Sequence, residues 1–252
     1  MPVADVTARM FILDSPAWAS AAAGDVVEVG GAEGQHAVTV VRLRPGETVL
    51  LGGGGRRAEA TVTHTGKSAF AARLETVVDE PENDPRFVLV QALAKAGRDE
   101  QAVETATELG VDEVVPWQAA RGVVVWRGRE REEKGRRRWR SVCVAASKQS
   151  RRGRVPVVSE PAATSDVAAR VTRAALGLVL DEAATEPLAA VELPIAGDVV
   201  VVVGPEGGIS DAELAELVAA GGRAVRLGPE VLRSSTAGPA ALAVLAASLR
   251  WR

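Results

Sequence analysis

The chain has few of the residues that carry disulfide or metal chemistry. Among its 252 residues there is one cysteine, Cys143, which excludes an intramolecular disulfide framework and fits a reducing cytosol. Cys143 stands in the apolar stretch Val142-Cys-Val-Ala-Ala146, so we expect a small core residue and not a nucleophile. Only two histidines, His36 and His64, are present, which disfavours a histidine-built metal site, and we expect no metal.

Long apolar segments are also missing. No run of about 18 apolar residues indicates a membrane span, so we expect no membrane partner. No long apolar run follows a basic start, so we expect no signal peptide. Hydrophobic residues still make up 47% of the chain, enough for the core of one large or two small domains. Together these features favour a cytoplasmic protein.

The clearest pattern that the chain does contain is a run of valines that ends on glycine and proline. Val199–Val203 are five consecutive valines, as expected for a strand covered on both faces in a parallel sheet. Gly204-Pro-Glu-Gly-Gly208 follows, and its glycines allow a tight turn and a close approach of the backbone to a ligand. Ser210, with Glu213 three residues later, then has the pattern of a capped helix start.

This turn lacks the two common nucleotide-binding fingerprints. No Gly-Lys-Ser/Thr follows it, and its glycines do not have the G-x-G-x-x-G spacing. A second unit follows at Leu227-Gly-Pro-Glu230 and continues through Leu232–Gly238 before an Ala/Leu-rich helix predicted over 237–249. Because open α/β sheets bind ligands beyond the carboxyl ends of their strands, the two neighbouring turns predict a small-molecule pocket. Either turn alone is equally consistent with a structural connection.

Positive charge is concentrated in one segment of a chain whose net charge is −3. Residues 121–154 hold thirteen Lys and Arg against three Glu, a balance of +10, which leaves −13 for the rest. Such asymmetry is typical of a surface that meets phosphates, although a solvated helix face is the alternative. Trp139, which stands among these arginines, either stacks on a base or anchors the buried side of the helix.

The pattern of apolar runs divides the chain in two. Residues 1–78 hold short apolar runs separated by glycine turns, which suggests a small β-barrel. A polar segment with two prolines, 79–86, is the predicted linker. From 87 to 252 strands and helices alternate, which predicts an α/β domain with a basic helix over 134–150.

These blocks resemble the SPOUT class of S-adenosylmethionine-dependent RNA methyltransferases. Within that class the chain is similar to the RsmE-type enzymes, which methylate N3 of a uridine in 16S (small-subunit) ribosomal RNA. The resemblance rests on the two glycine turns and on Arg9-Met-Phe11, His36–Gly46 and the Ala146–Pro156 segment, so it covers nearly the whole chain. It implies an N-terminal PUA-like β-barrel, followed by a SPOUT α/β domain with a deep C-terminal trefoil knot. It also implies that the protein is a homodimer. The expected RNA partner is ribosomal RNA within the small ribosomal subunit.

The same resemblance implies S-adenosyl-L-methionine as the cofactor, held by the last strands and loops of the second domain. The residues that it places at the cofactor are Leu180, Asp181, Gly204, Pro205, Glu206, Gly207, Gly208, Leu227, Gly228, Val231, Leu232, Ser234, Thr236 and Ala237. The polar and basic residues expected to contact RNA are Arg9, Arg42, Arg44, Lys95, Arg136, Arg137, Arg138, Gln149 and Arg152. Each of the arginines and Lys95 is also compatible with an ordinary surface position.

Methyl transfer from a sulfonium to a nitrogen needs no metal and depends on positioning. The proton on uridine N3 must leave, and a cation near the developing anion stabilises it; our candidate for this catalytic role is Arg233. Its alternative role is a structural salt bridge. Many family members have Arg-x-Glu-Thr-Ala where this chain has Arg233-Ser-Ser-Thr-Ala237, and Ser235 cannot act as a carboxylate base. Glu206 and water remain as acceptors of the proton.

Two other functions compete with this hypothesis. One is a different SPOUT RNA methyltransferase, for example one that acts on the ribose 2′-oxygen of tRNA, although the PUA-like first domain and the Ala146–Gln149 block argue against it. The other is a non-catalytic RNA-binding protein that has kept the fold. Cofactor binding separates the enzymes from the RNA-binding protein.

Overall fold

The fold is known from a computed structural model of the chain, in which residues 8–251 are described. The first seven residues of the predicted 1–78 domain and the last residue of the predicted 87–252 domain lie outside the described residues. The chain forms two compact units. The first consists of residues up to Glu82 together with Ser147–Val155, and the second of Asn83–Ala146 and the residues from Pro156 onward.

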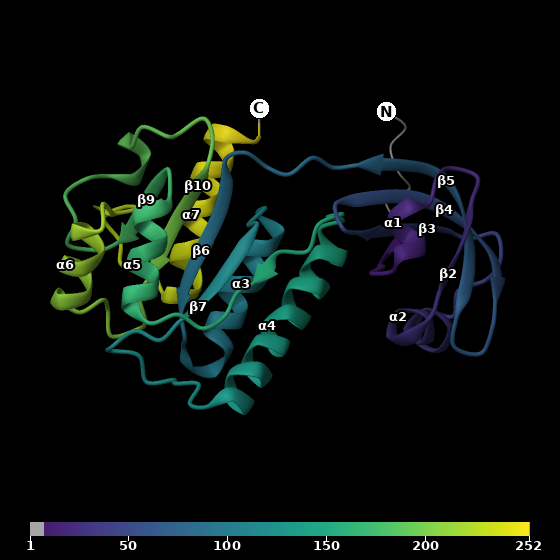
Figure 1. The fold of residues 1–252 in the computed structure, drawn as a ribbon, viewed down its shortest axis with the longest axis horizontal. Helices are drawn as coiled ribbons and strands as arrows, with labels where there is room; N and C mark the ends of the chain where they lie inside the picture. The colour runs from purple at the N-terminus through teal and green to yellow at the C-terminus, as the bar shows by residue number, and fades with distance from the viewer. Residues whose placement is uncertain (1–7, 252) are drawn as a thin grey trace. The chain divides into compact units, whose positions relative to one another are not determined.

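The first unit is a curled five-stranded sheet (Figure 1). Its strand order is β1-β3-β4-β5-β2, in which β1 pairs with β3 in parallel and the other neighbours are antiparallel. Buried residues from all five strands, with Trp18 and Ala37, form its core. Its elements are β1 (Arg9–Ile12), α1 (Pro16–Ser20), β2 (Val26–Val29), α2 (Gly31–His36), η1 (Ala37–Val41), β3 (Thr48–Gly53), β4 (Arg56–Thr65) and β5 (Phe70–Asp79).

A short segment from the middle of the chain completes the first unit. Lys148 forms an ion pair with both carboxylate oxygens of Glu33 at 2.9 Å. Farther along, the Gly55 N–H donates to the Gly153 carbonyl at 3.0 Å, and the Gly153 N–H donates to the Glu80 carboxylate at 3.1 Å. The sequence pattern does not indicate this association, because it depends on side chains and backbone groups far apart in the chain.

The second unit is built on a six-stranded sheet whose strands are all parallel, in the order β11-β9-β10-β6-β7-β8. The predicted valine strand is β10, and it lies between β6 and β9, buried along its length from Val199 to Val203 as expected. The strands are β6 (Arg86–Ala92), β7 (Glu113–Trp117), β8 (Val157–Val158), β9 (Leu176–Leu180), β10 (Asp198–Val203) and β11 (Arg223–Val225).

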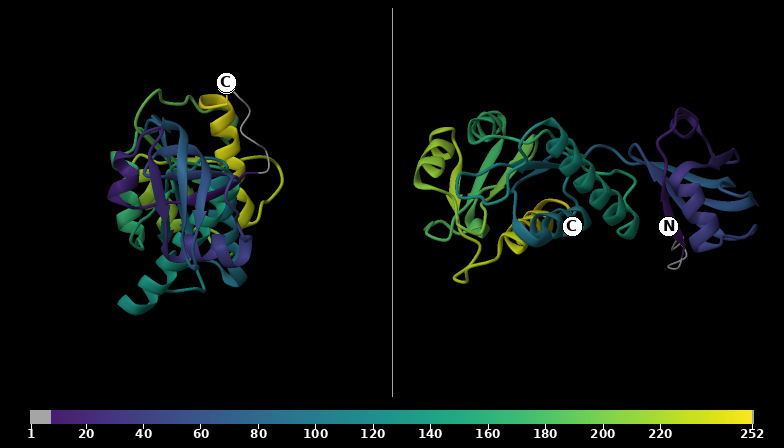
Figure 2. Two further views of the ribbon diagram at one scale, coloured as in Figure 1. Left: turned by 90° about the vertical axis from the view of Figure 1, so that its right-hand side faces the viewer. Right: turned by 90° about the horizontal axis from the view of Figure 1, so that it is seen from below.

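Helices cover both faces of this sheet (Figures 1 and 2). The helices α3 (Arg98–Glu108) and α7 (Ser234–Leu249) lie on one face, and α5 (Thr164–Arg173) and α6 (Asp211–Ala219) on the other. The contact of α7 is close, since a Cβ added at Gly238 would lie 2.9 Å from Leu89 Cδ1. The remaining elements are η2 (Lys95–Gly97), η3 (Leu188–Ala190) and the 21-residue α4 (Arg129–Gln149). Within residues 8–251, no helix combines the length and apolarity that crossing a membrane requires.

The end of α7 is fixed to the start of the sheet by Arg250. Its guanidinium donates to the carbonyls of Gly110 and Pro85 at 2.5 and 2.7 Å and to the Asp112 carboxylate at 2.6 Å. It also lies over the Phe87 ring, 3.6 Å from the centroid. Because α7 therefore runs toward the amino ends of the strands, its first residue, Ser234, lies at their carboxyl ends.

Candidate functional site

The predicted cofactor residues come together at the carboxyl edge of the parallel sheet. In the sheet, β9 lies between β10 and β11, and all three strands end at this edge. Leu180 is the last residue of β9, and the Asp181 N–H donates to the Val225 carbonyl of β11 at 3.0 Å. The turn Gly204–Gly208 follows β10, and the loop with Leu227 and Gly228 follows β11. The sheet order thus places segments about 50 residues apart at one site.

The first glycine turn is closed by its own backbone. The Gly208 N–H donates to the Pro205 carbonyl at 2.9 Å, and Gly208 has a φ of +73°, a conformation that favours glycine. A Cβ at Gly204 would lie 2.7 Å from Ile209 Cγ1, so this glycine is needed for packing within the turn. Gly207 and Gly208 are exposed, and their backbone faces solvent. The Ser210–Glu213 capping box then starts α6, as the sequence predicts.

The second turn leads directly into the start of α7. Arg233 is the N-cap residue of α7, and its carbonyl accepts hydrogen bonds from the N–H groups of Thr236 and Ala237. Its side chain is exposed and forms no ion pair within residues 8–251. Val231 and Leu232 are also exposed, at 73% and 38%.

Two buried polar atoms behind these turns have no hydrogen-bond partner within residues 8–251. They are Gln91 Oε1, next to the end of β6, and Ser234 Oγ, in the first turn of α7. Gly238 packs over Leu89, so Ser234, one helical turn earlier, lies toward the end of β6 where Gln91 is found. A buried polar atom without a partner costs about 1–3 kcal/mol, so this edge favours a polar ligand or water.

Glu206, in the middle of the first turn, is bound to the loop that follows β6. Its Oε1 accepts hydrogen bonds from the Lys95 N–H at 3.3 Å and from Arg98 Nη1 at 3.2 Å. Asp99 also fixes this loop, because its carboxylate accepts hydrogen bonds from the N–H groups of Glu100 and Ala94. Burial raises the pKa of Asp99, and these hydrogen bonds only partly offset the effect. No local sequence pattern indicates that Arg98 belongs to the site, because Arg98 and Glu206 are 108 positions apart in the chain.

A second arginine contacts the other side of the turn. Arg121 Nη1 donates to the Ile209 carbonyl at 3.1 Å, and its Cβ would lie 3.3 Å from a Cβ placed at Gly207. The loop that carries Arg121 is attached through Glu213, whose Oε1 accepts the Ala120 N–H at 2.7 Å. The turn therefore lies between the loops that follow β6 and β7.

Glu213 connects three loops at this edge. It accepts hydrogen bonds from the Thr164 hydroxyl at 3.0 Å, the Ser210 hydroxyl at 2.7 Å and the Ala120 N–H, and it is only 5% exposed. Burial by itself raises the pKa of Glu213, but these hydrogen bonds outweigh the burial and lower the pKa below its ordinary value. The carboxylate is therefore ionised at neutral pH and holds the loops together.

The structure separates the predicted RNA contacts into several groups. Arg136 donates to the carbonyls of Ser159 and Val158 and pairs with Glu160 at 2.6 Å, so its guanidinium is held within the fold. Arg137 and Arg138 are exposed, at 65% and 68% of their side chains. Lys95 is exposed at the carboxyl edge, and the candidates in the first unit are Arg9, Arg42, Arg44, Gln149 and Arg152.

Trp139 is 1% exposed, which decides between its two predicted roles in favour of the helix anchor. Its ring meets the Trp126 ring edge-on, with 5.7 Å between centroids. The Trp126 ring in turn occupies the space where Gly135 of α4 would carry a Cβ, 2.4 Å from the nearest ring atom. Glycine is thus required in the middle of this helix.

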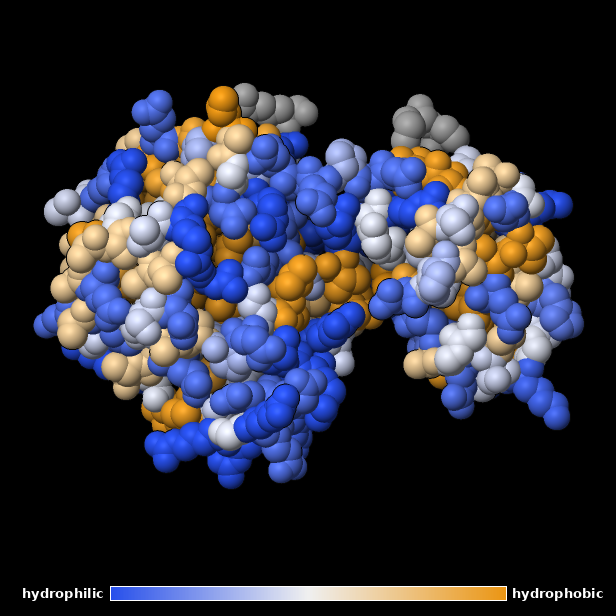
Figure 3. Space-filling model, viewed as in Figure 1, coloured by the Kyte–Doolittle hydropathy of each residue, from blue (hydrophilic) through white to orange (hydrophobic). Residues whose placement is uncertain are grey.

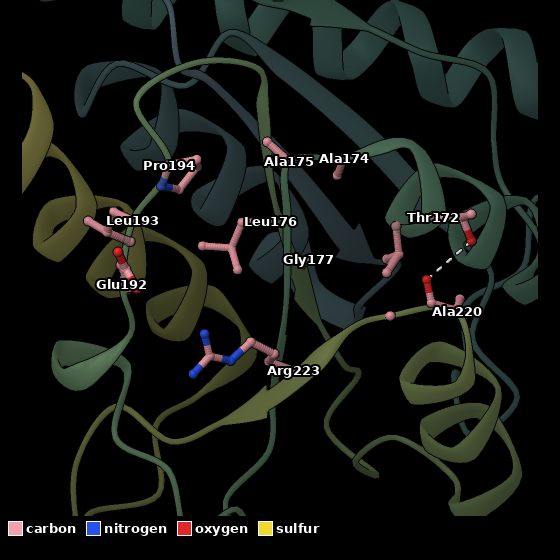
Figure 4. Close-up of a pocket in the computed structure, with 12 residues that line it drawn as sticks. Thr172, Ala174, Ala175, Leu176, Gly177, Glu192, Leu193, Pro194, Ala220 and Arg223 are labelled. Atoms are coloured by element: carbon pink, nitrogen blue, oxygen red, sulfur yellow. Dashed lines mark hydrogen bonds between the residues drawn. The ribbon is translucent and has the colours of Figure 1, made fainter.

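A pocket lies at the opposite edge of the sheet (Figure 4). It is lined by the first residues of β9 and β11 and by the segments that precede β9, β10 and β11, among them Thr172, Leu176, Glu192 and Arg223. The Thr172 hydroxyl donates to the Ala220 carbonyl at 3.2 Å, which closes one side of it. Because the glycine turns are at the other ends of these strands, this pocket is separate from the candidate site. Across residues 8–251 there is no group of three metal-ligating side chains.

Comparison with known proteins gives consistent matches along the chain. The RNA methyltransferase domain family matches residues 81–246, and the RNA methyltransferase PUA domain family matches residues 29–75. The ribosomal RNA small subunit methyltransferase E of Mycobacterium bovis is 47% identical, with 90% of this chain and 89% of the relative covered. The protein of the same name from Bacillus subtilis is 28% identical, with 83% and 85% covered.

Solved structures agree with these matches. The ribosomal RNA small subunit methyltransferase E of Neisseria gonorrhoeae, bound to S-adenosyl methionine, has a TM-score of 0.84 at 26% identity. The alignment covers 96% of this chain and 98% of that chain. Both units of the fold are therefore shared with this structure.

Glu213 gives the site a predicted dependence on pH. A carboxyl group whose pKa is lowered by folding stabilises the protein above its unfolded pKa, and this stabilisation is lost as the pH falls through the lowered value. Glu213→Gln should therefore lower the free energy of unfolding at pH 7, and the difference from the wild type should shrink toward acid pH. Urea unfolding of both proteins across a pH series measures it, with exposed Glu216→Gln as the control. A difference that stays constant with pH would contradict the role of the ionised carboxylate.

Proposed function

The chain belongs to the RNA methyltransferase family that includes the ribosomal RNA small subunit methyltransferase E proteins, and we propose that it methylates 16S ribosomal RNA with S-adenosyl-L-methionine as the methyl donor. The acceptor in this proposal is N3 of one uridine. The observation that carries it is the arrangement of two glycine turns and the start of α7 at one sheet edge, in a chain 47% identical to such an enzyme.

The residues at this edge fit the cofactor. Exposed backbone at Gly207 and Gly208 offers hydrogen bonds to a base without special side chains, and the loop at Leu227 and Gly228 does the same from the neighbouring turn. The unpartnered Ser234 Oγ provides a polar group for the amino-acid end. When bound, the cofactor supplies an electrophilic methyl group. The remaining residues predicted at the cofactor lie at the end of β9, in the two turns and in the first turn of α7.

The protein's own contribution is to orient the uridine and to stabilise its anion. Arg233 presents an exposed guanidinium beside the second turn, where it can bind the oxygen that gains negative charge as N3 loses its proton. Ser235 is buried and cannot accept that proton as a carboxylate would. Glu206 already accepts two hydrogen bonds from Lys95 and Arg98. We therefore assign the proton to water.

We include the finer features of the fold in the proposal. The first unit is a PUA-like barrel that binds RNA through Arg9, Arg42 and Arg44. The second unit contains a trefoil knot; the insertion of β10 between β6 and β9, and the return of α7 across β6 and β10, support it. The enzyme acts in the cytoplasm on RNA of the small ribosomal subunit.

Gly208→Val tests the cofactor pocket. The valine side chain should occupy space above the turn and weaken the binding of S-adenosyl-L-methionine at least about tenfold, equivalent to about 1.4 kcal/mol. Gly208→Ala is the closest control, because it also places a Cβ at a φ of +73° with a much smaller side chain. The β-branched valine carries more backbone strain there, so thermal unfolding of both variants is compared first. Isothermal titration calorimetry measures both. Equal affinities for the wild type and the valine variant would place the cofactor elsewhere.

Arg233→Ala tests the catalytic assignment. Loss of a cation that acts on the developing anion should lower kcat by about a hundredfold to a thousandfold. The affinities for cofactor and RNA should change little, and Arg233→Lys should restore part of kcat. Single-turnover methylation of 16S ribosomal RNA transcripts measures these values. A rise in KM with an unchanged kcat would instead make Arg233 a binding residue.

A homodimer is the third testable part of the proposal. Apolar side chains remain exposed along the last segment of the chain, including Val231, Val244 and Trp251. Burial of this surface against a second copy would account for them. Light scattering at micromolar concentration should give a dimer mass, and Val244→Glu should shift it toward the monomer. A wild-type monomer would contradict this assignment.

A further inference from the structure

The helix α4 has a buried face and a cationic face. Trp139, Cys143 and Ala146 are buried on one side. Arg131, Lys134 and Arg138 stand at positions i, i+3 and i+7, so they form one stripe along the exposed side, and all three are exposed. Figure 3 shows a mostly hydrophilic surface over this part of the second unit. We refer to these three residues as the α4 stripe.

The α4 stripe is attached to the candidate site through α3. Arg138 Nε lies 2.7 Å from Glu100 Oε1. Glu100 is in the first turn of α3, two residues after Arg98, whose guanidinium binds Glu206 of the first glycine turn. A short series of contacts thus connects the stripe with the turn.

A second connection runs through the loop between β7 and α4. The Trp126 ring packs against Gly135 and Trp139, and the Trp126 N–H donates to the Gln118 side chain at 3.1 Å. The same loop carries Arg121, which contacts the Ile209 carbonyl. Because α4 is fixed to both sides of the turn, a polymer lying along the stripe would be guided toward the site.

The three cations of the α4 stripe are more available to a ligand than Arg136, which belongs to the same helix. Arg136 is held by two carbonyls and Glu160, as described above. Arg131 and Lys134 form no ion pair within residues 8–251, and Arg138 has one partner but is 68% exposed. The Arg138 guanidinium has further N–H donors besides Nε, so a phosphate can bind it while the pair with Glu100, whose side chain is 22% exposed, stays in place.

We propose that the α4 stripe binds the sugar–phosphate backbone of a single-stranded RNA segment next to the target nucleotide. The inference rests on the proposed function, because it assumes that the glycine turns receive that nucleotide. The contact is independent of base sequence, because the stripe itself consists of cations: Trp139 is buried, and the half-buried Trp126 packs its ring against Trp139 and Gly135.

The test compares Arg131→Gln/Lys134→Gln/Arg138→Gln with the wild-type protein. Fluorescence anisotropy with a labelled single-stranded RNA gives the affinity at several salt concentrations. The loss of three phosphate contacts should weaken binding and reduce the slope of log K against log salt by about 2. In methylation assays, KM for 16S ribosomal RNA should rise while kcat and the affinity for S-adenosyl-L-methionine stay unchanged.

Two single variants serve as controls. Arg136→Gln removes an arginine of the same helix that is bound within the fold, so it should lower thermal stability and leave the salt slope unchanged. Arg173→Gln removes an exposed cation from α5, at the amino edge of the sheet, and should change neither property.

Three results would overturn the inference. The first is an unchanged salt slope in the triple variant. The second is a parallel loss of cofactor affinity, which would make the helix a support of the site. The third is competition by polyglutamate as strong as that by RNA at equal charge, which would assign the stripe to an acidic protein. A wild-type protein that binds no S-adenosyl-L-methionine would refute the proposed function and leave the RNA measurement interpretable.

Discussion

The parallel pairing of β10 with both β6 and β9 is the constraint on which the second unit depends. The register runs from Asp198 opposite Arg86 to Val203 opposite Gln91, and β10 pairs with β9 on its other side. Burial of each valine side chain contributes about 1.5 to 3 kcal/mol, so this strand supplies much of the core. The same pairing aligns β6, β9 and β10 in parallel, so the loops that follow these three strands all begin at one edge of the sheet. Stability of the sheet and geometry of the candidate site therefore have a common origin.

The parts of the fold that were predictable from the sequence have local causes. The valine run, the Ser210–Glu213 cap and the apolar last helix each depend on neighbouring residues, and β10, α6 and α7 appear close to their predicted positions. Strand β1 was not predicted, because its four residues are defined by parallel pairing with β3, some 40 residues away. The contact between Glu206 and Arg98, and the two unpartnered atoms beside the site, likewise have no local signature.

Charge alone does not tell which arginines serve function. The +10 segment contains Arg136, whose guanidinium satisfies carbonyls at the end of β8, and Arg131, which faces solvent. Arg250 lies outside this segment, yet its pair with Asp112 is largely buried, with side chains only 15% and 6% exposed. Breaking such a pair costs about 3 to 5 kcal/mol, whereas an exposed pair contributes about 0 to 1 kcal/mol. Burial and hydrogen-bond partners therefore separate structural arginines from those available to RNA.

The position of Arg233 supports its proposed role on electrostatic grounds. It caps the 16-residue α7 at the N-terminus, where the helix dipole carries about half a positive charge and disfavours a cation by roughly 0.3 to 1 kcal/mol. Folding stability alone would select Ser, Asp or Asn at that position. The exposed guanidinium and the helix end together form a positive potential that is favourable only when an anion is present. A uridine that has lost its N3 proton is such an anion, and it exists only during the reaction. Stabilisation that appears with the anion lowers the barrier without tightening the ground state, as catalysis requires.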